Sequence, residues 1–442
     1  MTVYLHSLGC DKNLVDSEIM LGLLYEAGYK TNSDPSLADT IVVNTCGFIQ
    51  EAVEEGIQTI LEMAQYKKSA GGGNCETLIV TGCMAQRYRD EILAEIPEVD
   101  KILGVNDYPM IVGKEIDVLD DELYEKRART MPLHIAYIKI SEGCDNCCTY
   151  CTIPSIRGSY RDRKFESIIK ECERLAKNGA KEFVIVAQDT AKYGTQLYGR
   201  NRLHELLNEL ASIENMGWIR IMYAYPEHIY PKLIETIAEN DKICKYIDMP
   251  IQHSHDAVIA RMGRKSTNEN LKKLIAQLKD KKIAIRTTII TGFPGETEAE
   301  FESLVAFIKE AKFEHLGVFT YSKEEDTPAA KMKPQIKANI KKARQNEIME
   351  AQAKIAEEHN SALIGQILKV IVDGNIAADS PEADEIIYCG RSDRFAYDVD
   401  GTVFFSLPSS SQELISGDWV KIKINQNQGY DVYGELVEII ED

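Results

Sequence analysis

Four cysteines within eight residues constrain this chain more than any other feature of its sequence. They are Cys144, Cys147, Cys148 and Cys151. The β-rich run Ala136 to Ile140 precedes them, so a strand is predicted to lead into a cysteine-rich loop. The first residues lack the basic and apolar segments of an export signal, so we expect a reducing, cytoplasmic environment. Thiols in such a compartment bind metal more often than they form disulfides.

The spacing of these cysteines allows two interpretations. Two adjacent CxxC pairs would indicate zinc, but zinc sites place such pairs roughly 15 to 20 residues apart so that they can face each other. In the CxxxCxxC interpretation, Cys144, Cys148 and Cys151 bind three irons of a [4Fe-4S] cluster and leave the fourth iron open to a small molecule. We favour the second interpretation, which leaves Cys147 outside the ligand set.

Three further cysteines each follow a β-rich run in the first region of the chain, about residues 1–120. The predicted strands are Val3 to His6, Thr40 to Asn44 and Thr77 to Thr81, and the cysteines are Cys10, Cys46 and Cys83. Helical stretches alternate with these strands, which predicts an α/β layer. Open parallel sheets form ligand sites at the carboxyl ends of their strands. If the three strands are parallel neighbours, the three thiols therefore meet at one edge and form a second metal site.

The second region, about residues 130–360, contains six more predicted strands that alternate with helices. These strands are Ala136 to Ile140, Glu182 to Ala187, Trp218 to Met222, Tyr246 to Met249, Ala284 to Ile290 and Leu316 to Thr320. Six such units predict a partial (β/α)6 barrel with its active site at the carboxyl ends of the strands. A helix over Lys341 to His359 is expected to close the region.

The third region, about residues 365–442, shows strand-like alternation around Val420 to Ile424 and predicts a small all-β barrel. It holds 15 Asp and Glu against five Lys and Arg, a net charge of −10, within a chain of net charge −19. Such a tail repels RNA phosphates and attracts a basic protein. RNA contact is therefore disfavoured, and no segment is apolar enough to predict a membrane span.

The CxxxCxxC spacing, with Tyr150 before its last cysteine, resembles the radical S-adenosylmethionine superfamily. This resemblance implies that the loop cluster reduces S-adenosylmethionine and releases a 5′-deoxyadenosyl radical. The segment Thr291 to Thr297 follows a strand, and its Gly292, Gly295 and Glu296 are predicted to contact the adenosyl group. Gln188 and Asp189 follow another strand and are predicted to contact the methionyl end, with Tyr150 beside the cluster.

The whole chain resembles the methylthiotransferases, with an amino-terminal cysteine domain, a radical core and a carboxyl-terminal TRAM barrel. The motifs LGCDKNLVDSE (8–18), NTCGFI (44–49), TGCMAQR (81–87) and VAQDT (186–190) are similar to the type that modifies small-subunit ribosomal protein twelve. The resemblance implies methylthiolation of an aspartate β-carbon in that protein or in the ribosome. S-adenosylmethionine would be both methyl donor and radical source, with a flavodoxin-type or ferredoxin-type electron donor.

The same resemblance implies that Cys10, Cys46 and Cys83 hold a second [4Fe-4S] cluster whose open iron carries the sulfur to be transferred. Two alternatives remain open at this point. A methylthiotransferase acting on an adenosine of transfer RNA would share both cysteine motifs and the barrel. A non-catalytic iron-sulfur or zinc module would share the thiols, but would leave the segment GFPGET and the six βα units without a purpose.

Overall fold

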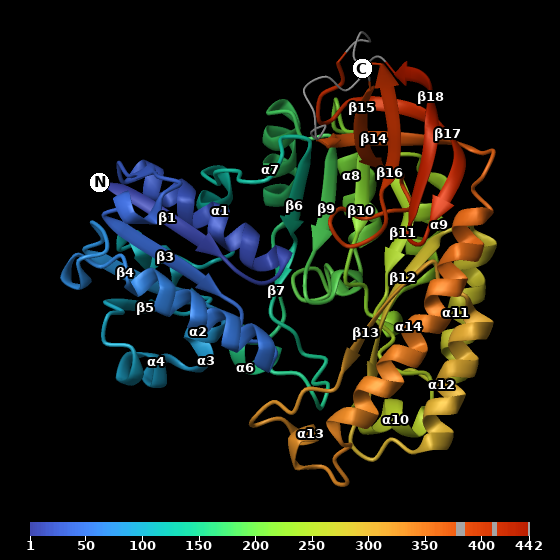
Figure 1. Ribbon diagram of the computed structural model, residues 1–442, viewed down its shortest axis with the longest axis horizontal. Coiled ribbons are helices and arrows are strands. Elements are labelled where there is room, and N and C mark those ends of the chain that lie inside the picture. The colour runs from blue at the N-terminus through green and yellow to red at the C-terminus, as the bar shows by residue number, and fades with distance from the viewer. Residues whose placement is uncertain (377–384, 409–412, 441–442) are drawn as a thin grey trace.

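The computed structural model describes residues 1–376, 385–408 and 413–440. Figure 1 shows an amino-terminal α/β layer, a central curved sheet with helices on its outer side, and a carboxyl-terminal barrel. None of the helices in these ranges is both long and apolar enough to cross a membrane. Three segments of the predicted acidic tail lie outside the described residues, namely 377–384, 409–412 and 441–442.

The amino-terminal layer is a parallel sheet in the order β2-β1-β3-β4-β5. Its elements are β1 (Thr2–Ser7), α1 (Asp11–Glu26), β2 (Lys30–Thr31), β3 (Thr40–Thr45), α2 (Gln50–Ala64), β4 (Thr77–Gly82), α3 (Cys83–Arg87), α4 (Arg89–Glu95), β5 (Lys101–Leu103) and α5 (Asp121–Glu125). The central strand β3 is buried along its whole length, as its apolar sequence TIVVNT predicts. The three predicted strands are present as neighbours, and the short edge strands β2 and β5 were not predicted.

The core is a parallel sheet in the order β13-β12-β11-β10-β9-β6, an open six-stranded barrel as predicted. Its strands are β6 (Ile135–Lys139), β9 (Glu182–Val186), β10 (Trp218–Ile221), β11 (Ile243–Asp248), β12 (Ala284–Thr291) and β13 (His315–Thr320). Its helices are α6 (Ile153–Arg157), α7 (Phe165–Lys177), α8 (Leu203–Ala211), α9 (Pro231–Glu239), α10 (Asp256–Arg261), α11 (Asn268–Asp280), α12 (Glu298–Ala311), α13 (Pro328–Lys331) and α14 (Ala338–Ser361).

The carboxyl-terminal part is a closed barrel in the order β14-β15-β16-β18-β17. Its strands are β14 (Ile367–Ile376), β15 (Glu385–Arg391), β16 (Val403–Pro408), β17 (Trp419–Gln428) and β18 (Asp431–Ile440). Alternating apolar residues of these strands fill the barrel interior, including Val420, Ile422 and Ile424. The all-β barrel that the alternation predicts is therefore present.

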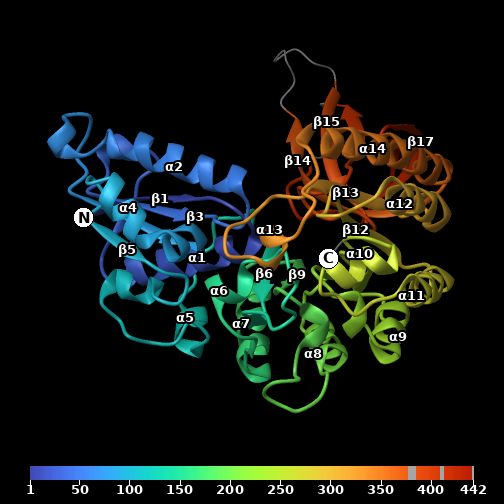
Figure 2. The ribbon, with the colours of Figure 1, turned by 90° about the horizontal axis from the view of Figure 1, so that it is seen from below.

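One hydrophobic cluster joins all three parts. It contains Val15 and Ile19 of α1, Tyr137 and Val184 of the core sheet, and Trp419 of the barrel. The barrel packs at the amino ends of the core strands, while the cysteine loop follows the carboxyl end of β6. The first sheet lies beside the core, as the view from below shows (Figure 2). This packing leaves the carboxyl ends of the core strands on the side away from the barrel.

Candidate functional site

The first three candidate thiols lie at the carboxyl ends of adjacent parallel strands. The pairs Ser7–Asn44 and Thr45–Gly82 are in register, so β1, β3 and β4 end at the same level. Cys10 precedes the first turn of α1, Cys46 follows β3 directly, and Cys83 is the first residue of α3. The structure thus brings these three cysteines, called the triad below, to one edge of the sheet.

Glycines beside the triad allow the backbone segments to approach closely. Gly9 has φ +92°, and a Cβ there would lie 2.8 Å from Cys46 Cβ. Gly82 has φ +96°, and a Cβ there would lie 2.3 Å from the carbonyl oxygen of Thr45. Residues with a Cβ rarely adopt such φ values, and a Cβ at either position would collide with its neighbour. Gly9 and Gly82 therefore allow the three cysteines to come together.

The triad thiols interact with one another and with a buried cation. Burial raises the pKa of the Cys83 thiol to about 11, while the positive charge of Arg157 acts in the opposite direction and the Cys10 and Cys46 thiols raise it further. Burial also raises the pKa of Cys46, with opposing hydrogen bonds from the backbone of Phe48 and Gly47. These thiols therefore favour the neutral form until a positively charged partner compensates them.

The second set of thiols lies in the loop 143–160, which leaves the core sheet after β6. A two-stranded ladder of β7 (Ser141–Glu142) and β8 (Arg161–Asp162) closes the base of this loop. Inside it, the Cys151 backbone N–H donates to the carbonyl of Cys148, and Cys144 N–H donates to Gly158. Cys147 is exposed and has φ +50°. Cys147 is thus more exposed than the other three cysteines of the loop, and its place outside the ligand set stays a prediction.

Burial dominates the acidity of the loop thiols as well. It raises the pKa of Cys144 to about 11 and that of Cys151 to about 12. The Tyr225 hydroxyl lies 3.5 Å from Cys148 Sγ, and the Arg264 guanidinium lies 4.0 Å from the centre of the Tyr225 ring. Tyr225 and Arg264 therefore border the loop. The sequence did not predict their place there, because both come from segments far from the loop along the chain.

The donor sets fit iron-sulfur clusters. Each set supplies three thiols, and the thiols of each set lie close enough to influence one another's pKa. Thiolates are the usual ligands of such clusters.

Asp189 lies beside the loop, and its contact with the methionyl end of S-adenosylmethionine stays a prediction. It is buried, and its carboxylate accepts hydrogen bonds from Asn146 Nδ2 at 3.0 Å and from the His228 ring at 2.6 Å. Gln188 keeps a buried side-chain oxygen without a protein partner. Tyr150 packs edge-on against Phe293, with ring centres 6.3 Å apart. These residues join the loop to the carboxyl ends of β9 and β12.

The turn after β12 is held by contacts of its own. Glu296 accepts hydrogen bonds from the backbone of Gly292 at 3.0 Å and from Arg344 at 2.6 Å. Burial raises the pKa of Glu296, with Arg344 opposing that effect. A Cβ on Gly292 would meet the Lys341 side chain at 2.3 Å, whereas Gly295 has more open surroundings. Glu296 therefore braces this turn, and a role in binding a cofactor stays a prediction for all three residues.

The remaining cysteines lie away from both sets. Cys75 precedes β4, Cys172 is in α7 and Cys389 is in β15. Cys244 stands two residues before the predicted strand Tyr246 to Met249 but lies inside β11, because this strand begins three residues earlier than predicted.

A buried ion network joins the amino-terminal layer to the core, and we call it the amino-terminal seam. It consists of Asp16 from α1 with Lys139, Glu142 and Arg157 from the core. Arg157 Nη1 lies 3.0 Å from Glu142 Oε2 and 3.3 Å from Asp16 Oδ2. All four side chains are at most 5% exposed. Sequence reasoning missed this seam, because its members have no common motif.

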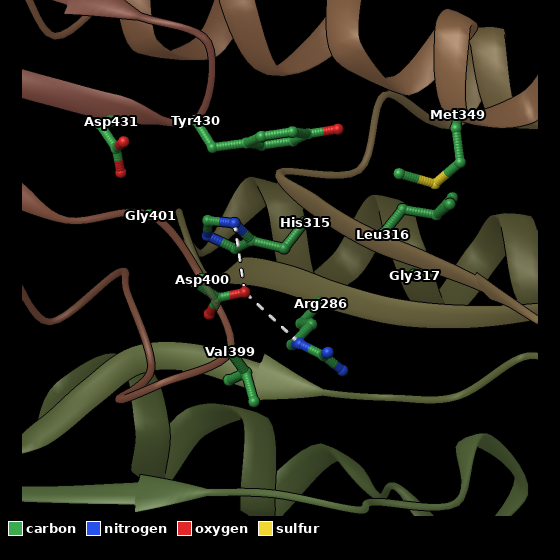
Figure 3. A pocket seen from close by; sticks show the side chains of 10 residues that line it. All are labelled: Arg286, His315, Leu316, Gly317, Met349, Val399, Asp400, Gly401, Tyr430 and Asp431. Atoms are coloured by element: carbon green, nitrogen blue, oxygen red, sulfur yellow. Dashed lines mark ion pairs between the residues drawn. The ribbon is translucent and has the colours of Figure 1, made fainter. Parts of the chain in front are cut away.

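A second buried network, the barrel seam, joins the core to the barrel. It consists of Glu182 and Arg220 from the core with Asp373 and Arg391 from the barrel. Nearby, Arg286 and His315 both form ion pairs with Asp400 in the wall of a cavity of about 280 Å³ (Figure 3). This cavity lies between the core and the barrel and contains none of the candidate thiols, so it is separate from the candidate site.

Comparison with known proteins agrees with this architecture. Residues 2–104 match the uncharacterized protein family UPF0004, residues 138–308 match the radical SAM superfamily, and residues 364–437 match the TRAM domain. Among solved structures, the radical S-adenosylmethionine methyltransferase TsrM from Kitasatospora setae superposes with a TM-score of 0.49 at 13% identity, over 74% of this chain and 73% of that one.

Curated relatives match over almost the whole chain. The ribosomal protein uS12 methylthiotransferase RimO of Lachnoclostridium phytofermentans is 47% identical over 98% of this chain and 99% of its own length. The RimO protein of Acetivibrio thermocellus is 46% identical over 98% of this chain and 97% of its own length. At this identity and coverage, the chain belongs to the RimO family of radical SAM methylthiotransferases.

Proposed function

We propose that this chain methylthiolates the β-carbon of an aspartate in ribosomal protein uS12. The observation that carries the proposal is the 47% identity to a uS12 methylthiotransferase over 98% of the chain, which includes both sets of thiols. We place the reaction in the cytoplasm and divide the chain into a thiol domain (1–120), a radical core (130–360) and a TRAM barrel (365–442). An electron donor of flavodoxin or ferredoxin type would complete the system.

The two sets of thiols suit two different tasks. We assign Cys144, Cys148 and Cys151 to a [4Fe-4S] cluster that binds S-adenosylmethionine, and the triad to a second cluster. When bound, these groups supply one-electron reduction of the sulfonium and a carrier for the transferred sulfur. Asp189 would hold Asn146 and the loop in place for the methionyl end, while Tyr150 and Phe293 shield the site from water. The ion pairs of the amino-terminal seam would hold the two sets of thiols close to each other.

An acidic groove beside the triad supports a polypeptide substrate. A cavity of about 510 Å³ lies between α2, α3–α4 and the core segment 323–325, and Val53, Ile57 and Leu61 line it. Its wall also holds four glutamates, one Arg and one Lys, and one of these glutamates, Glu324, is paired with Arg87. Helix α3 begins at Cys83, so the groove starts next to the triad. An apolar floor with an anionic rim favours a cationic polypeptide over the phosphates of transfer RNA.

An anaerobic assay tests this proposal against both alternatives. The reconstituted chain is incubated with S-adenosylmethionine and reductant, and with either purified uS12 or bulk transfer RNA. We expect deoxyadenosine release and the added mass of a methylthio group on uS12 alone. Modified transfer RNA beside unmodified uS12 would favour the adenosine-modifying alternative. One zinc and no sulfide in anaerobically purified protein would favour the non-catalytic module.

A further inference from the structure

Arg157 ends the short helix α6, six residues after the last loop cysteine, yet its guanidinium reaches the other side of the seam. Its Nη2 donates to Asn13 Oδ1 at 2.6 Å, and its Nη1 donates to Glu142 Oε2 at 3.0 Å. The side chain is 1% exposed. A cation from the core is therefore buried next to the amino-terminal layer.

On the triad side, Asn13 links Arg157 to the segments that carry all three thiols. Asn13 connects these groups, because its Oδ1 also lies 3.7 Å from Cys83 Sγ. Asn13 Nδ2 donates to the carbonyl of Thr45, directly before Cys46, and to the carbonyl of Leu8.

On the loop side, Arg157 is fixed to the segment that leads into the second set of thiols. Its partner Glu142 lies two residues before Cys144 and also accepts a hydrogen bond from the Gly143 backbone at 3.1 Å. The same guanidinium thus contacts groups that border both sets of thiols. Arginine suits this position, because its planar group stays charged and can bridge two acceptors.

We propose that Arg157 is a positioning residue of the triad, supplied by the core to balance the negative charge that Cys10, Cys46 and Cys83 acquire as ligands. Three thiolates around a [4Fe-4S]2+ core leave a net negative charge in a buried place, and Arg157 is a buried cation that Asn13 links to Cys83. The inference rests on the proposed function, in that the triad holds a cluster.

The test measures bound iron, bound sulfide and the reduction potential of the cluster. It is made in the Cys148→Ala chain, which leaves the triad as the only complete set of thiols. We expect Arg157→Met to lose most of the iron and sulfide that this chain binds. Any cluster that remains should have a lower midpoint potential, because removal of a nearby positive charge favours the oxidised form. Arg157→Lys keeps the charge and should restore the iron content and the potential.

The matched control is Arg220→Met, which removes an equally buried arginine from the barrel seam. It should lower the thermal midpoint while iron, sulfide and potential per folded chain stay unchanged. If Arg157→Met keeps its iron and potential and only loses stability, or if Arg157→Lys behaves like Arg157→Met, the inference is overturned. If the Cys148→Ala chain with Arg157 intact binds no cluster, the assignment of the triad in the proposed function fails as well.

Discussion

The amino-terminal seam and the barrel seam are built from the same kinds of side chain but have different neighbours. Each pairs two buried cations with two carboxylates, and each joins segments far apart in the chain. The barrel seam adds only packing, such as the Trp218 and Trp419 rings in edge-to-face contact at 4.7 Å. The amino-terminal seam instead lies between two sets of cysteines. Buried ion pairs therefore do not by themselves mark a functional site. The groups that lie beside them indicate whether they belong to one.

Glu142 and Glu182 show how similar the two seams are electrostatically. Burial acts to raise the pKa of Glu142, but Arg157 and Lys139 outweigh it and hold the value at about 2. Burial likewise opposes Arg391 and Arg220 at Glu182, whose pKa is also about 2. Since both carboxylates are ionised at neutral pH, the seams differ in what they border rather than in charge state.

The largest expected effects come from replacing one cysteine in either set of thiols, because the two sets have different proposed tasks. Cys148→Ala should lower both deoxyadenosine release and methylthiolation at least about 100-fold, because it removes a ligand that no neighbour can replace. Cys83→Ala should lower methylthiolation to the same extent and leave deoxyadenosine release within about twofold of wild type. Product analysis by mass spectrometry measures both.

Cys147→Ala is the control for this first prediction and should keep both activities, because Cys147 is exposed and outside the proposed ligand set. Loss of activity in Cys147→Ala together with an active Cys148→Ala would mean that the ligand assignment in the loop is wrong.

A second prediction breaks the barrel seam alone. Glu182→Gln leaves Arg220 and Arg391 buried without their shared carboxylate, which should lower the free energy of unfolding by about 3–5 kcal/mol. Urea unfolding measures this loss. Iron and sulfide per folded chain should not change, with Glu269→Gln at an exposed pair as control. A fall in iron content in Glu182→Gln would contradict the separation of the two seams.

A third prediction concerns acid. The folded pKa of Glu182 lies below its ordinary value of 4.5, so its stabilisation is fully present above pH 4.5 and is lost as the pH falls towards about 2. This contribution is about 3 kcal/mol. The free energy of unfolding of the iron-free chain is measured in urea between pH 6 and 2.5. Over this range it should fall less steeply in Glu182→Gln than in wild type. Equal slopes of the free energy of unfolding against pH would mean that other carboxylates cause the loss of stability in acid.

The smallest expected effect concerns Asp189, which lies beside the cysteine loop and belongs to neither seam. Asp189→Asn weakens the acceptor for Asn146 and His228, and should weaken S-adenosylmethionine binding about tenfold, or 1.4 kcal/mol. Equilibrium dialysis measures this affinity. The control Asp145→Asn lies in the same loop but is exposed and paired with Lys192, so it should bind like wild type. Equal affinity in all three proteins would remove Asp189 from the proposed site.

Much of the fold could be predicted because its signals are local. Apolar runs such as TIVVNT and WIRI predict buried strands, and the six core strands and the barrel follow from the same periodicity. The meeting of Cys10, Cys46 and Cys83 was also predictable, since parallel strands end at one edge of a sheet. The two-residue strand β2 and the three-residue strand β5 were missed, because so few residues give no periodicity.

The sequence by itself determined where the thiols are and which strands lead to them, because spacing along the chain fixes a loop and the end of a strand. Only the tertiary structure decided what surrounds them: Arg157 beside Asn13, Tyr225 beside Cys148, and Glu296 engaged in its own turn. These contacts depend on how separate sheets pack together. That packing is set by the summed burial of many side chains, and no local pattern of residues encodes it.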